Sequence, residues 1–490
     1  MSLPPLAPLT PHIAEANSDA LGFERALKIF HEAARRVPAY KNFLEKHNIR
    51  PEDIKTKSDF SQVPLVDKVN YISQYSLEDL SWDGVLDEAK CISTSSGSTG
   101  APFYWPRGER QEQVTGMIFQ YVYESIFGAK DHSTLCVDSF ALGTWIAGLE
   151  LYNATRWSTN QGSKIVIITP GIDQAEVLNQ IKKLSRGFKR IILAGYPPFV
   201  KDSIESGTAS GINWSTMDIR LLTGGEAFSE TWRERVLHMI GKKPDDLESL
   251  IAMYGMAETG VVGHETPLSI HVRRLLRNMK ISDPALPEYH DDIAIYQYYP
   301  TARYFEVADD HSLILTSDAG LPLVRYDTRD VGGIVSFETI TSRIRSLLPT
   351  ITEHVDISTW QLPFIYLYGR KDFSVSFYAL KIYVENIKRA LEHPTISHLV
   401  SGLSTMDVEH TSTLDQSLHI IIELSRGSTP NAALHKTISQ VVVNTLREVN
   451  SEYNKLYTSI GERALPTIEL VPYGKIDTIP GRKHKWIKRS

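Results

Sequence analysis

The sequence of 490 residues contains only two cysteines, Cys91 and Cys136. Two thiols cannot build a disulfide framework or a cysteine-rich zinc site, and such a low count is typical of a reducing compartment. The chain also lacks an apolar run near the roughly 20 residues that a membrane-spanning helix needs. Residues 1–19 lack the basic and then apolar pattern of a secretory signal. These absences predict a soluble, cytoplasmic protein without a membrane partner.

An excess of positive charge is missing as well. The chain has 58 acidic and 52 basic side chains, and its formal net charge is −6. This balance argues against a nucleic-acid partner bound through bulk charge. Apolar residues make up 42% and charged residues 22% of the chain, as in ordinary globular proteins. The length is enough for two or three domains with a large core.

The first part of the chain predicts an α/β layer structure. A loose arm over residues 1–20 precedes a stretch of helical spacing over residues 23–47. From about residue 133, apolar strand patterns alternate with amphipathic helix patterns, which favours a parallel, doubly wound sheet. Strands are expected within residues 133–140, 164–171, 189–198, 219–228 and 249–260, and helices within residues 173–185 and 229–241.

The pattern changes after about residue 370 and predicts a small α+β unit. Helices are expected over residues 379–394 and 433–457, and strands over residues 417–425 and 466–476. We therefore expect an N-terminal domain over residues 1–371 and a C-terminal domain over residues 372–490.

The stretch TSSGSTGAP, from Thr94 to Pro102, allows two interpretations of equal weight when taken alone. Its glycines can turn backbone N–H groups inward to bind an anion, and its hydroxyls can add donors. The stretch lacks the lysine that a Walker loop carries before its Ser or Thr. The alternative is a flexible Ser/Gly-rich connector.

Other segments favour the phosphate-binding interpretation. Several predicted strands end in glycine-rich or polar turns, and the ends of strands collect ligands in open α/β sheets. In chain order the motifs are TSSGSTGAP, AGYPP, LTGGEAFSE, MYGMAETG, LPLVRYDTRD, GRKD and a basic C-terminus. Six such motifs in this order resemble the adenylate-forming superfamily of acyl-CoA synthetases, adenylation domains and luciferases. The segments from Arg35 to Lys68 and from Leu321 to Asp330 are most similar to its phenylacetate–CoA ligase branch. A more distant similarity is to acyl-protein synthetases.

The resemblance implies a large multi-layer N-terminal α/β domain and a small mobile α+β C-terminal domain. It also implies two half-reactions. A carboxylate first attacks the α-phosphate of ATP, giving acyl-AMP and pyrophosphate, and a nucleophile such as the CoA thiol then displaces AMP. The first step needs charge neutralisation and in-line positioning of two anions.

The resemblance also assigns roles to individual residues. The β- and γ-phosphates would be held by Ser95, Ser96, Gly97, Ser98, Thr99 and Gly100. The adenine side would be lined by Gly224, Gly225, Glu226, Tyr254 and Gly255. Glu258 would bind Mg²⁺, a hard cation that suits a carboxylate oxygen. Asp330 would accept hydrogen bonds from both ribose hydroxyls, and Arg370 would lie near the ribose and the phosphate.

The end of the chain would act through a hinge and a lysine. Asp372 matches the hinge on which the small domain rotates between the half-reactions. Lys483 is the best match for the lysine that reaches the acyl-phosphate oxygens, where a compact charge stabilises a developing oxyanion. Lys485 is the second choice.

The sequence departs from the family pattern at three places. Ala101 stands where a lysine is common, which removes one cation near the pyrophosphate. Ala257 replaces a hydroxyl that touches the α-phosphate, and Thr259 is a substitute two residues further on. Ala379, after Tyr378, stands where a glycine lets the pantetheine arm pass, so a methyl group there could obstruct it. Activation of the acid is thus better supported than CoA as the acceptor, and an amine or a carrier protein remains an alternative.

The acid would bind along residues 141–157, with Trp145 and Gly148 as candidate walls. An aromatic wall suits an aromatic acid, although Trp145 is equally expected as an ordinary core residue. His264 could face the acid or be a hydrogen-bonded structural histidine. A different class of function, a degenerate nucleotide-binding scaffold, is motivated by Ala101 and Ala257. The family also raises a homodimer as an option.

Overall fold

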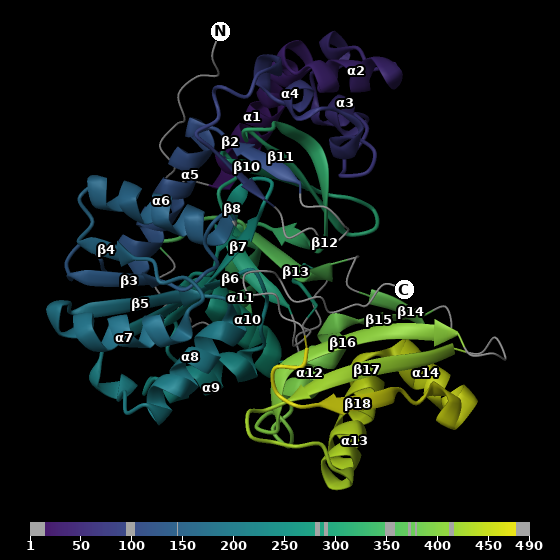
Figure 1. Cartoon of the computed structure of the whole chain (residues 1–490). Coiled ribbons are helices and arrows are strands. Elements are labelled where there is room, and N and C mark those ends of the chain that lie inside the picture. The colour runs from purple at the N-terminus through teal and green to yellow at the C-terminus, as the bar shows by residue number, and fades with distance from the viewer. Residues whose placement is uncertain are drawn as a thin grey trace. The chain divides into compact units, whose positions relative to one another are not determined.

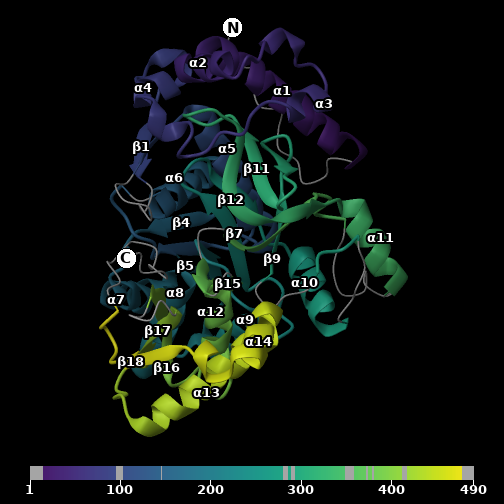
Figure 2. The same cartoon turned by 90° about the vertical axis from the view of Figure 1, so that its right-hand side faces the viewer.

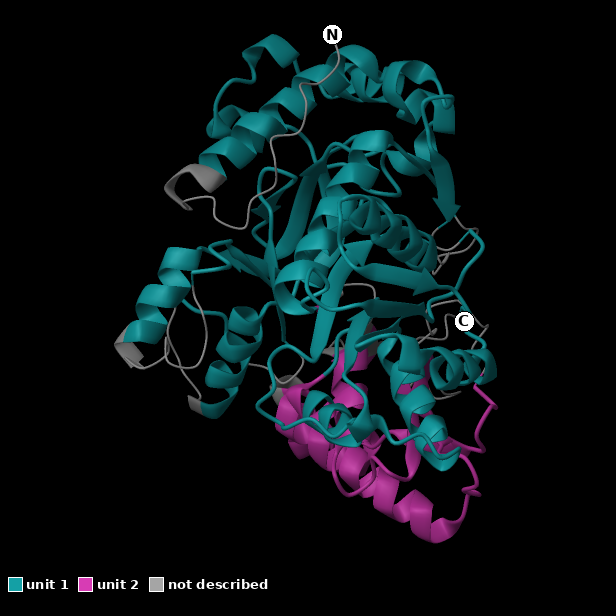
Figure 3. Ribbon diagram, turned by 90° about the vertical axis from the view of Figure 1, so that its left-hand side faces the viewer, with its two compact units in different colours: residues 1–228, 233–368 teal, residues 229–232, 369–490 magenta. Residues whose placement is uncertain are grey.

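The computed structural model describes residues 15–94, 103–144, 146–279, 285–288, 293–347, 358–370, 374–377, 380–410 and 416–476. The chain divides into two compact units, shown in different colours in Figure 3. The larger unit comprises residues 1–228 and 233–368, and the smaller one comprises residues 229–232 and 369–490. This division falls near the boundary expected after residue 371. Among the described helices, none is long and apolar enough to cross a membrane.

The larger unit begins with a helical segment. Its helices are α1 (Glu15–Arg36), α2 (Pro38–Lys46), α3 (Lys57–Ser61) and α4 (Leu77–Leu80). The predicted helical stretch is therefore two helices, because Val37 is extended before Pro38. The expectation of a loose arm up to residue 20 was wrong for residues 15–20, which belong to α1. Phe30, Tyr40, Phe43, Phe60 and Tyr71 form the centre of a buried aromatic cluster here.

An eleven-stranded sheet forms the body of the larger unit, with the order β10-β11-β12-β13-β9-β8-β7-β6-β5-β3-β4. Its strands are β3 (Thr134–Asp138), β4 (Ile165–Ile168), β5 (Arg190–Gly195), β6 (Ile219–Gly224), β7 (Leu250–Met256), β8 (Gly260–His264), β9 (Ala294–Tyr298), β10 (Arg303–Val307), β11 (Ser312–Ser317), β12 (Leu323–Val335) and β13 (Phe364–Arg370). The predicted parallel sheet is confirmed for β4, β3, β5, β6 and β7. Beyond β7, the pairings of β7 with β8 and of β8 with β9 are antiparallel, starting with the tight β7–β8 connection.

Helices cover both faces of the parallel strands, as their amphipathic pattern predicts. The helices of this region are α5 (Glu109–Tyr121), α6 (Ile146–Asn160), α7 (Gln174–Leu184), α8 (Pro197–Ala209), α9 (Glu230–Met239), α10 (Pro267–Met279) and α11 (Phe337–Leu347). Figure 1 shows α5 and α6 on one side of these strands and α7 and α8 on the other. Helices α10 and α11 share a buried cluster with β9 and β13. Figure 2 shows α10 and α11 near β9. The antiparallel pair β1 (Cys91–Thr94) and β2 (Tyr104–Arg107) completes the unit.

The smaller unit has the predicted α+β character. Its elements are β14 (Ser374–Phe377), β15 (Leu380–Tyr383), α12 (Val384–Glu392), β16 (Val400–His410), β17 (Gln416–Leu424), α13 (Ala432–Val449), α14 (Ser451–Ile460) and β18 (Thr467–Val471). Two helix predictions were partly wrong. Residues 380–383 form a strand before α12, and the long helix breaks at Asn450, whose side chain caps α14 by accepting from the Tyr453 amide at 2.9 Å.

Candidate active site

The carboxyl ends of four parallel strands meet at one edge of the large sheet. Strands β3, β5, β6 and β7 lie side by side and run in the same direction. Three of the sequence motifs span these strand ends: AGYPP at the end of β5, LTGGEAFSE at the end of β6 and MYGMAETG at the end of β7. In open α/β sheets this edge is where ligands bind. The fold therefore brings three separate motifs to the edge that the sequence predicted.

Gly225 makes a close approach that no other residue type could make without strain. Its φ of +89° lies in the left-handed region, and a Cβ at this position would lie 2.4 Å from the Tyr196 ring. Gly224 is the last residue of β6 and is buried, whereas Glu226 is partly exposed. Burial and the nearby Glu226 carboxylate raise the pKa of Tyr196 to about 12. Tyr196 therefore stays a neutral phenol beside the predicted adenine segment.

Tyr254 and Asp330 are brought into direct contact. The Tyr254 hydroxyl donates to Oδ2 of Asp330 at 2.5 Å, and its ring stacks on Tyr296 with centroids 5.5 Å apart. Tyr254 and Asp330 are each 7% exposed. Tyr254 and Asp330, which the resemblance assigns to the nucleoside end of ATP, thus lie in contact although they belong to different strands, β7 and β12.

Glu258 is a largely buried carboxylate, 8% exposed, with two donors on one oxygen. The Tyr326 hydroxyl donates to Oε1 at 3.1 Å, and the Lys68 ammonium lies 2.7 Å from the same atom. An oxygen ligand of this kind suits Mg²⁺, which usually binds through one or two carboxylates, waters and substrate phosphates. The residues present therefore fit the metal that the sequence analysis assigned to Glu258.

Strand β12 has an unusual backbone conformation just before two candidate site residues. Arg325 and Arg329 have φ values of +50° and +65°, a region that side chains other than glycine seldom adopt. Each immediately precedes a site residue, Tyr326 or Asp330, and the pairing with β11 shifts its register here. Ion pairs hold both arginines, with Arg325 on Glu306 at 3.1 Å and Arg329 on Asp67 at 2.6 Å. Ion pairs with side chains outside β12 thus hold the two residues that have positive φ.

Thr259, which the sequence offers as a substitute for the hydroxyl missing at Ala257, is a buried residue. The side chain is fully buried, and its hydroxyl has no hydrogen-bond partner among the described residues. Its carbonyl oxygen accepts from Arg303 at 2.9 Å. Ala257, in contrast, is partly buried and packs beside the buried aromatic cluster of the N-terminal helices. The ATP-binding role given to Thr259 stays a prediction. Gly255 is partly exposed on β7.

His264 is a buried histidine with a hydrogen-bond partner on each ring nitrogen. Its Nδ1 is 2.8 Å from the Glu265 carbonyl oxygen and its Nε2 is 3.1 Å from the Tyr299 hydroxyl. Burial lowers the pKa of His264 to about 4. Both ring nitrogens thus have partners inside the core, which supports the structural alternative for His264, and its place in the acid pocket stays a prediction. Gly148 is buried in α6, where a Cβ would lie 2.7 Å from the Ala141 carbonyl oxygen, so packing alone explains this glycine.

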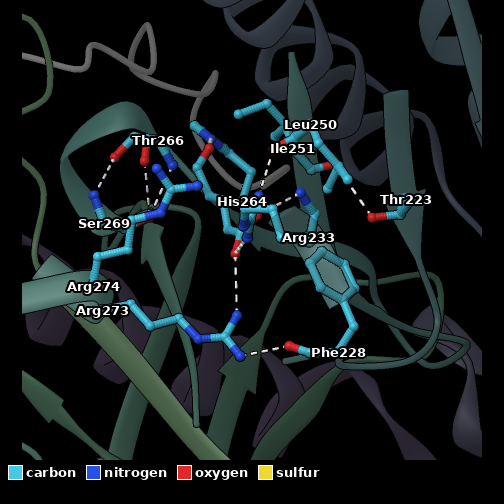
Figure 4. A network of polar contacts seen from close by, with 12 residues as sticks. Thr223, Phe228, Arg233, Leu250, Ile251, His264, Thr266, Ser269, Arg273 and Arg274 are labelled. Atoms are coloured by element: carbon cyan, nitrogen blue, oxygen red, sulfur yellow. Dashed lines mark hydrogen bonds and ion pairs between the residues drawn. The ribbon is translucent and has the colours of Figure 1, made fainter. Parts of the chain in front are cut away.

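A buried ionic network supports β7 at its beginning. Glu265 accepts from the Ala252 amide at 2.9 Å and from Arg233 at 2.5 Å, and Arg273 lies 3.8 Å from Glu265. Arg233 also donates to the Leu250 carbonyl at 2.6 Å, and Figure 4 shows Arg233, Arg273 and Leu250 in this network. All three charged side chains are nearly inaccessible to solvent. The network therefore supports the strand that contains Tyr254 and precedes Glu258.

The Ser/Gly-rich stretch joins two paired strands. Thr94, the last residue of β1, is the register partner of Tyr104, the first residue of β2. The Thr94 amide also donates to the Thr144 carbonyl at 2.8 Å, just before α6. The two strands that flank the stretch are thus held together, and the choice between a phosphate-binding loop and a flexible connector stays a prediction.

Several predicted site residues lie outside the part of the chain that the structure describes. These are Ser95, Ser96, Gly97, Ser98, Thr99, Gly100, Ala101, Trp145, Asp372, Tyr378, Ala379, Lys483 and Lys485. For Arg370 the structure describes only the backbone, as the last residue of β13. The roles given to these residues stay predictions.

The sequence did not single out Lys68, Tyr326 and Tyr196, which lie at the candidate site. All three belong to segments that carry the family resemblance, and this membership was the signal that could have found them.

A separate group of potential metal ligands lies on β16 and β17 of the smaller unit. Asp407, Glu409 and His419 have ligand atoms within 4.8 Å of one another, and Glu409 is exposed. An exposed group of this kind is common on protein surfaces without a bound ion, so it carries no assignment.

Comparison with known proteins supports the assignment of the fold. No family model matches the sequence, and no curated protein does either. The structure is similar to 2-hydroxyisobutyryl-CoA ligase in the postadenylation state in complex with R3-HIB-AMP. The TM-score is 0.70 at 14% identity, covering 100% of this chain and 94% of that chain. The complex of the same ligase with 2-HIB-AMP and CoA in the thioesterification state gives a TM-score of 0.56 at 15% identity, covering 99% of this chain and 94% of that one. The chain therefore has the fold of the adenylate-forming ligases.

Proposed function

We propose that this protein activates a carboxylic acid with Mg-ATP and passes the acyl group to an acceptor. Two hydrogen bonds carry the proposal: Tyr254 donates to Asp330, and Tyr326 donates to Glu258. Both lie in the larger unit, in which β6 ends at Gly224. Tyr254, expected at the nucleoside, lies on β7, and Asp330, expected there as well, lies on β12. Glu258, expected at the metal, comes two residues after β7 ends.

In the first half-reaction a carboxylate oxygen of the acid attacks the α-phosphorus of ATP. A new O–P bond forms, the bond from the α-phosphorus to the bridging oxygen breaks, and pyrophosphate leaves with the electron pair. Asp330 would accept hydrogen bonds from the ribose, and the Tyr254 ring would lie against the adenine beside Gly224, Gly225 and Glu226. Mg²⁺ at Glu258 would neutralise charge on the phosphates. The chain's own task is chiefly to position the reactants and stabilise charge.

The remaining roles come from the family resemblance. Ser95 to Gly100 would hold the β- and γ-phosphates, Arg370 would lie near the ribose, and Lys483 would stabilise the developing oxyanion. In the second half-reaction the acceptor attacks the acyl carbon, loses its proton to solvent, and expels AMP. CoA is the first acceptor to test, and an amine or a carrier protein is the alternative that Ala379 motivates. An aromatic acid is the first substrate class to test.

Exchange of radiolabelled pyrophosphate into ATP tests the proposal. We expect a panel of aromatic and fatty acids to contain at least one that supports exchange in Mg²⁺. Lys483→Ala should lower this exchange by about 100-fold or more, the scale for removing one oxyanion-stabilising group. Lys485→Ala is the matched control and should change it little; the reverse result would assign the role to Lys485. ATP binding without exchange for any acid would favour the scaffold alternative.

Mass spectrometry of the products identifies the acceptor. Reactions with CoA, with a panel of amines and with neither should yield the thioester, the amide or acyl-AMP alone. Thioester formation at an ordinary rate would show that Ala379 does not obstruct the pantetheine arm. Amide formation without thioester would instead identify an amide-forming ligase.

A further inference from the structure

Two buried arginines, Arg107 of β2 and Arg303 of β10, lie beside the turn that joins β7 to β8. Arg303 donates to the Thr259 carbonyl oxygen at 2.9 Å. Nη2 of Arg107 lies 3.0 Å from Oε1 of Glu150, and a Cβ added to Gly260 would lie 2.9 Å from the same Nη2. Each arginine is 1% exposed. Two guanidinium groups from different strands are therefore held inside the larger unit beside one short turn.

Arg303 pairs with no carboxylate in the part of the chain that the structure describes. Its acceptors are the carbonyl oxygens of Ala302, at 3.0 Å, and of Thr259. Burial lowers the pKa of Arg303 to about 10, and the carboxylates in its neighbourhood offset only part of that effect. Its contacts thus leave a buried positive charge without a negative partner, which is costly in a protein interior.

The ionic side chains around Arg303 also carry more positive than negative charge. We call them the buried ionic cluster, which consists of four arginines and three carboxylates: Arg25, Arg107, Arg110, Arg303, Glu112, Glu150 and Asp318. Arg107 pairs with two of the carboxylates, at 2.5 and 3.0 Å. Asp318 pairs with Arg25 at 3.6 Å and with Arg110 at 3.2 Å. One positive charge is therefore left over, and Arg303 is the member without an ion pair.

The cluster and two neighbouring side chains present donors that have no hydrogen-bond partner among the described residues. These are Nε of Arg303, Nε of Arg25, Nη1 of Arg107, Nε2 of Gln111 and Oγ of Ser317. Ser317 is the register partner of Arg303, so the two side chains lie on the same face of the sheet with Cβ atoms about 5 Å apart. Oε1 of Gln111 accepts from the Gly320 amide at 3.1 Å, two residues after Asp318.

These donors need an acceptor that the chain does not provide. Buried polar groups of native proteins nearly always have a partner, and a group without one in the chain points to a bound ion or water. Guanidinium and amide N–H groups can only donate. Surplus donors and surplus positive charge are two separate observations, and a bound anion answers both. A water molecule would answer only the first, since it brings no charge.

We propose that the buried ionic cluster binds a small monovalent anion of the chloride type beside Arg303. A single negative charge balances the cluster, and hydrogen bonds from charged donors to an anion are strong. Because Arg303 also donates to the turn before β8, the bound anion stabilises that turn and with it the larger unit. The inference does not rest on the proposed function, since it uses only charge and packing within this unit.

Thermal unfolding of chloride-free protein tests the proposal. Chloride replaces gluconate, a large organic anion, at constant ionic strength. A ligand that binds only the folded state raises the unfolding midpoint as its concentration rises. We expect a rise of about 2–5 °C when chloride reaches about a hundredfold of its dissociation constant. Arg303→Met removes the unpaired charge and should abolish this rise.

Ser317→Ala is a milder variant that keeps the test informative if Arg303→Met does not fold. It removes a donor that has no other partner, and about threefold or more chloride should be needed for the same rise. Ser312→Ala is the matched control and should respond to chloride as the wild type does. Ser312 lies on the same strand and has a buried hydroxyl without a partner among the described residues, but it pairs with Val331, outside the cluster.

Crystals grown in bromide locate the anion directly. We expect an anomalous peak within hydrogen-bond distance of Nε of Arg303. An ordered water molecule there without anomalous signal would overturn the proposal, and so would a chloride response that is the same in the wild type, Ser317→Ala and Arg303→Met. Neither measurement involves ATP. A protein that binds chloride but supports no pyrophosphate exchange would contradict only the proposed function.

Discussion

The Tyr254 hydroxyl donates to Oδ2 of Asp330 at 2.5 Å, across 76 residues of sequence. The contact ties the end of β7 to the middle of β12 and orients the carboxylate that we assign to the ribose. A hydrogen bond to a charged acceptor is worth about 1.5–3 kcal/mol. The two residues therefore act as one unit of the nucleoside site.

Tyr254→Phe removes this hydroxyl and keeps the ring. We expect AMP to bind about threefold to tenfold more weakly, because the Asp330 carboxylate loses the donor that orients it. Isothermal titration calorimetry with AMP measures the change. Tyr296→Phe is the matched control, since Tyr296 provides the stacked ring of the same pair. Unchanged or tighter AMP binding by Tyr254→Phe would contradict the role given to the contact.

Gly225→Ala should lower the stability of the fold more than the same substitution at Gly211, a glycine with a similar positive φ and open space around it. Gly211 has φ +84°, and a Cβ added there would meet no atom within 4 Å, so Gly211→Ala should cost about 1–2 kcal/mol for backbone strain alone. Gly225→Ala adds a clash with Tyr196 and should cost about 1–3 kcal/mol more. Urea unfolding of the two variants gives the difference. Equal losses would mean that Tyr196 moves aside freely.

Glu265→Gln should be among the most destabilising single changes in the larger unit. It removes a carboxylate that pairs with both Arg233 and Arg273 inside the core, and breaking a buried pair costs about 3–5 kcal/mol. Glu234→Gln is the control, because the Glu234–Arg277 pair is partly exposed at 2.5 Å and should contribute at most about 1 kcal/mol. Thermal unfolding of both variants tests this. A loss below that of Glu234→Gln would show that the network does not support β7.

Asp138→Asn should raise stability increasingly as the pH rises. Burial raises the pKa of Asp138 to about 8 in the folded protein, against 3.8 for the free group. Between these values the unfolded chain is ionised while the folded protein keeps the proton, so rising pH favours unfolding of the wild type. Asparagine has no such proton, and it can still accept from the Phe140 amide as Oδ1 does at 3.0 Å.

The stability gained by Asp138→Asn should therefore grow by about 1.4 kcal/mol per pH unit from about pH 4 to about pH 8. It should become constant above that range. Denaturant unfolding at several pH values measures the difference. Parallel stability curves for the wild type and Asp138→Asn would show that the carboxyl does not hold its proton in the folded protein.

Local patterns in the sequence were enough for much of the fold. The helix predicted within residues 173–185 is α7, where Asp173 acts as the cap by accepting from the Glu176 amide at 3.0 Å. The strand predicted within residues 219–228 is β6, which ends where two adjacent glycines, Gly224 and Gly225, interrupt the apolar run. The helix end at Asn450 was not predicted, because the helical pattern continues across this residue, whose side chain caps the next helix by accepting from the Tyr453 amide.

The sequence by itself determined the order of the motifs, the parallel strands and the residue types that suit ATP and Mg²⁺, since these depend on periodicity and on the chemistry of single side chains. Only the tertiary structure decided which of those residues meet. It joined Tyr254 to Asp330, placed His264 and Thr259 in the core, and set Lys68 on Glu258 through the bridge between Val66 and Tyr326. Contacts between residues so far apart in the chain depend on how strands pair and pack, which no local pattern encodes.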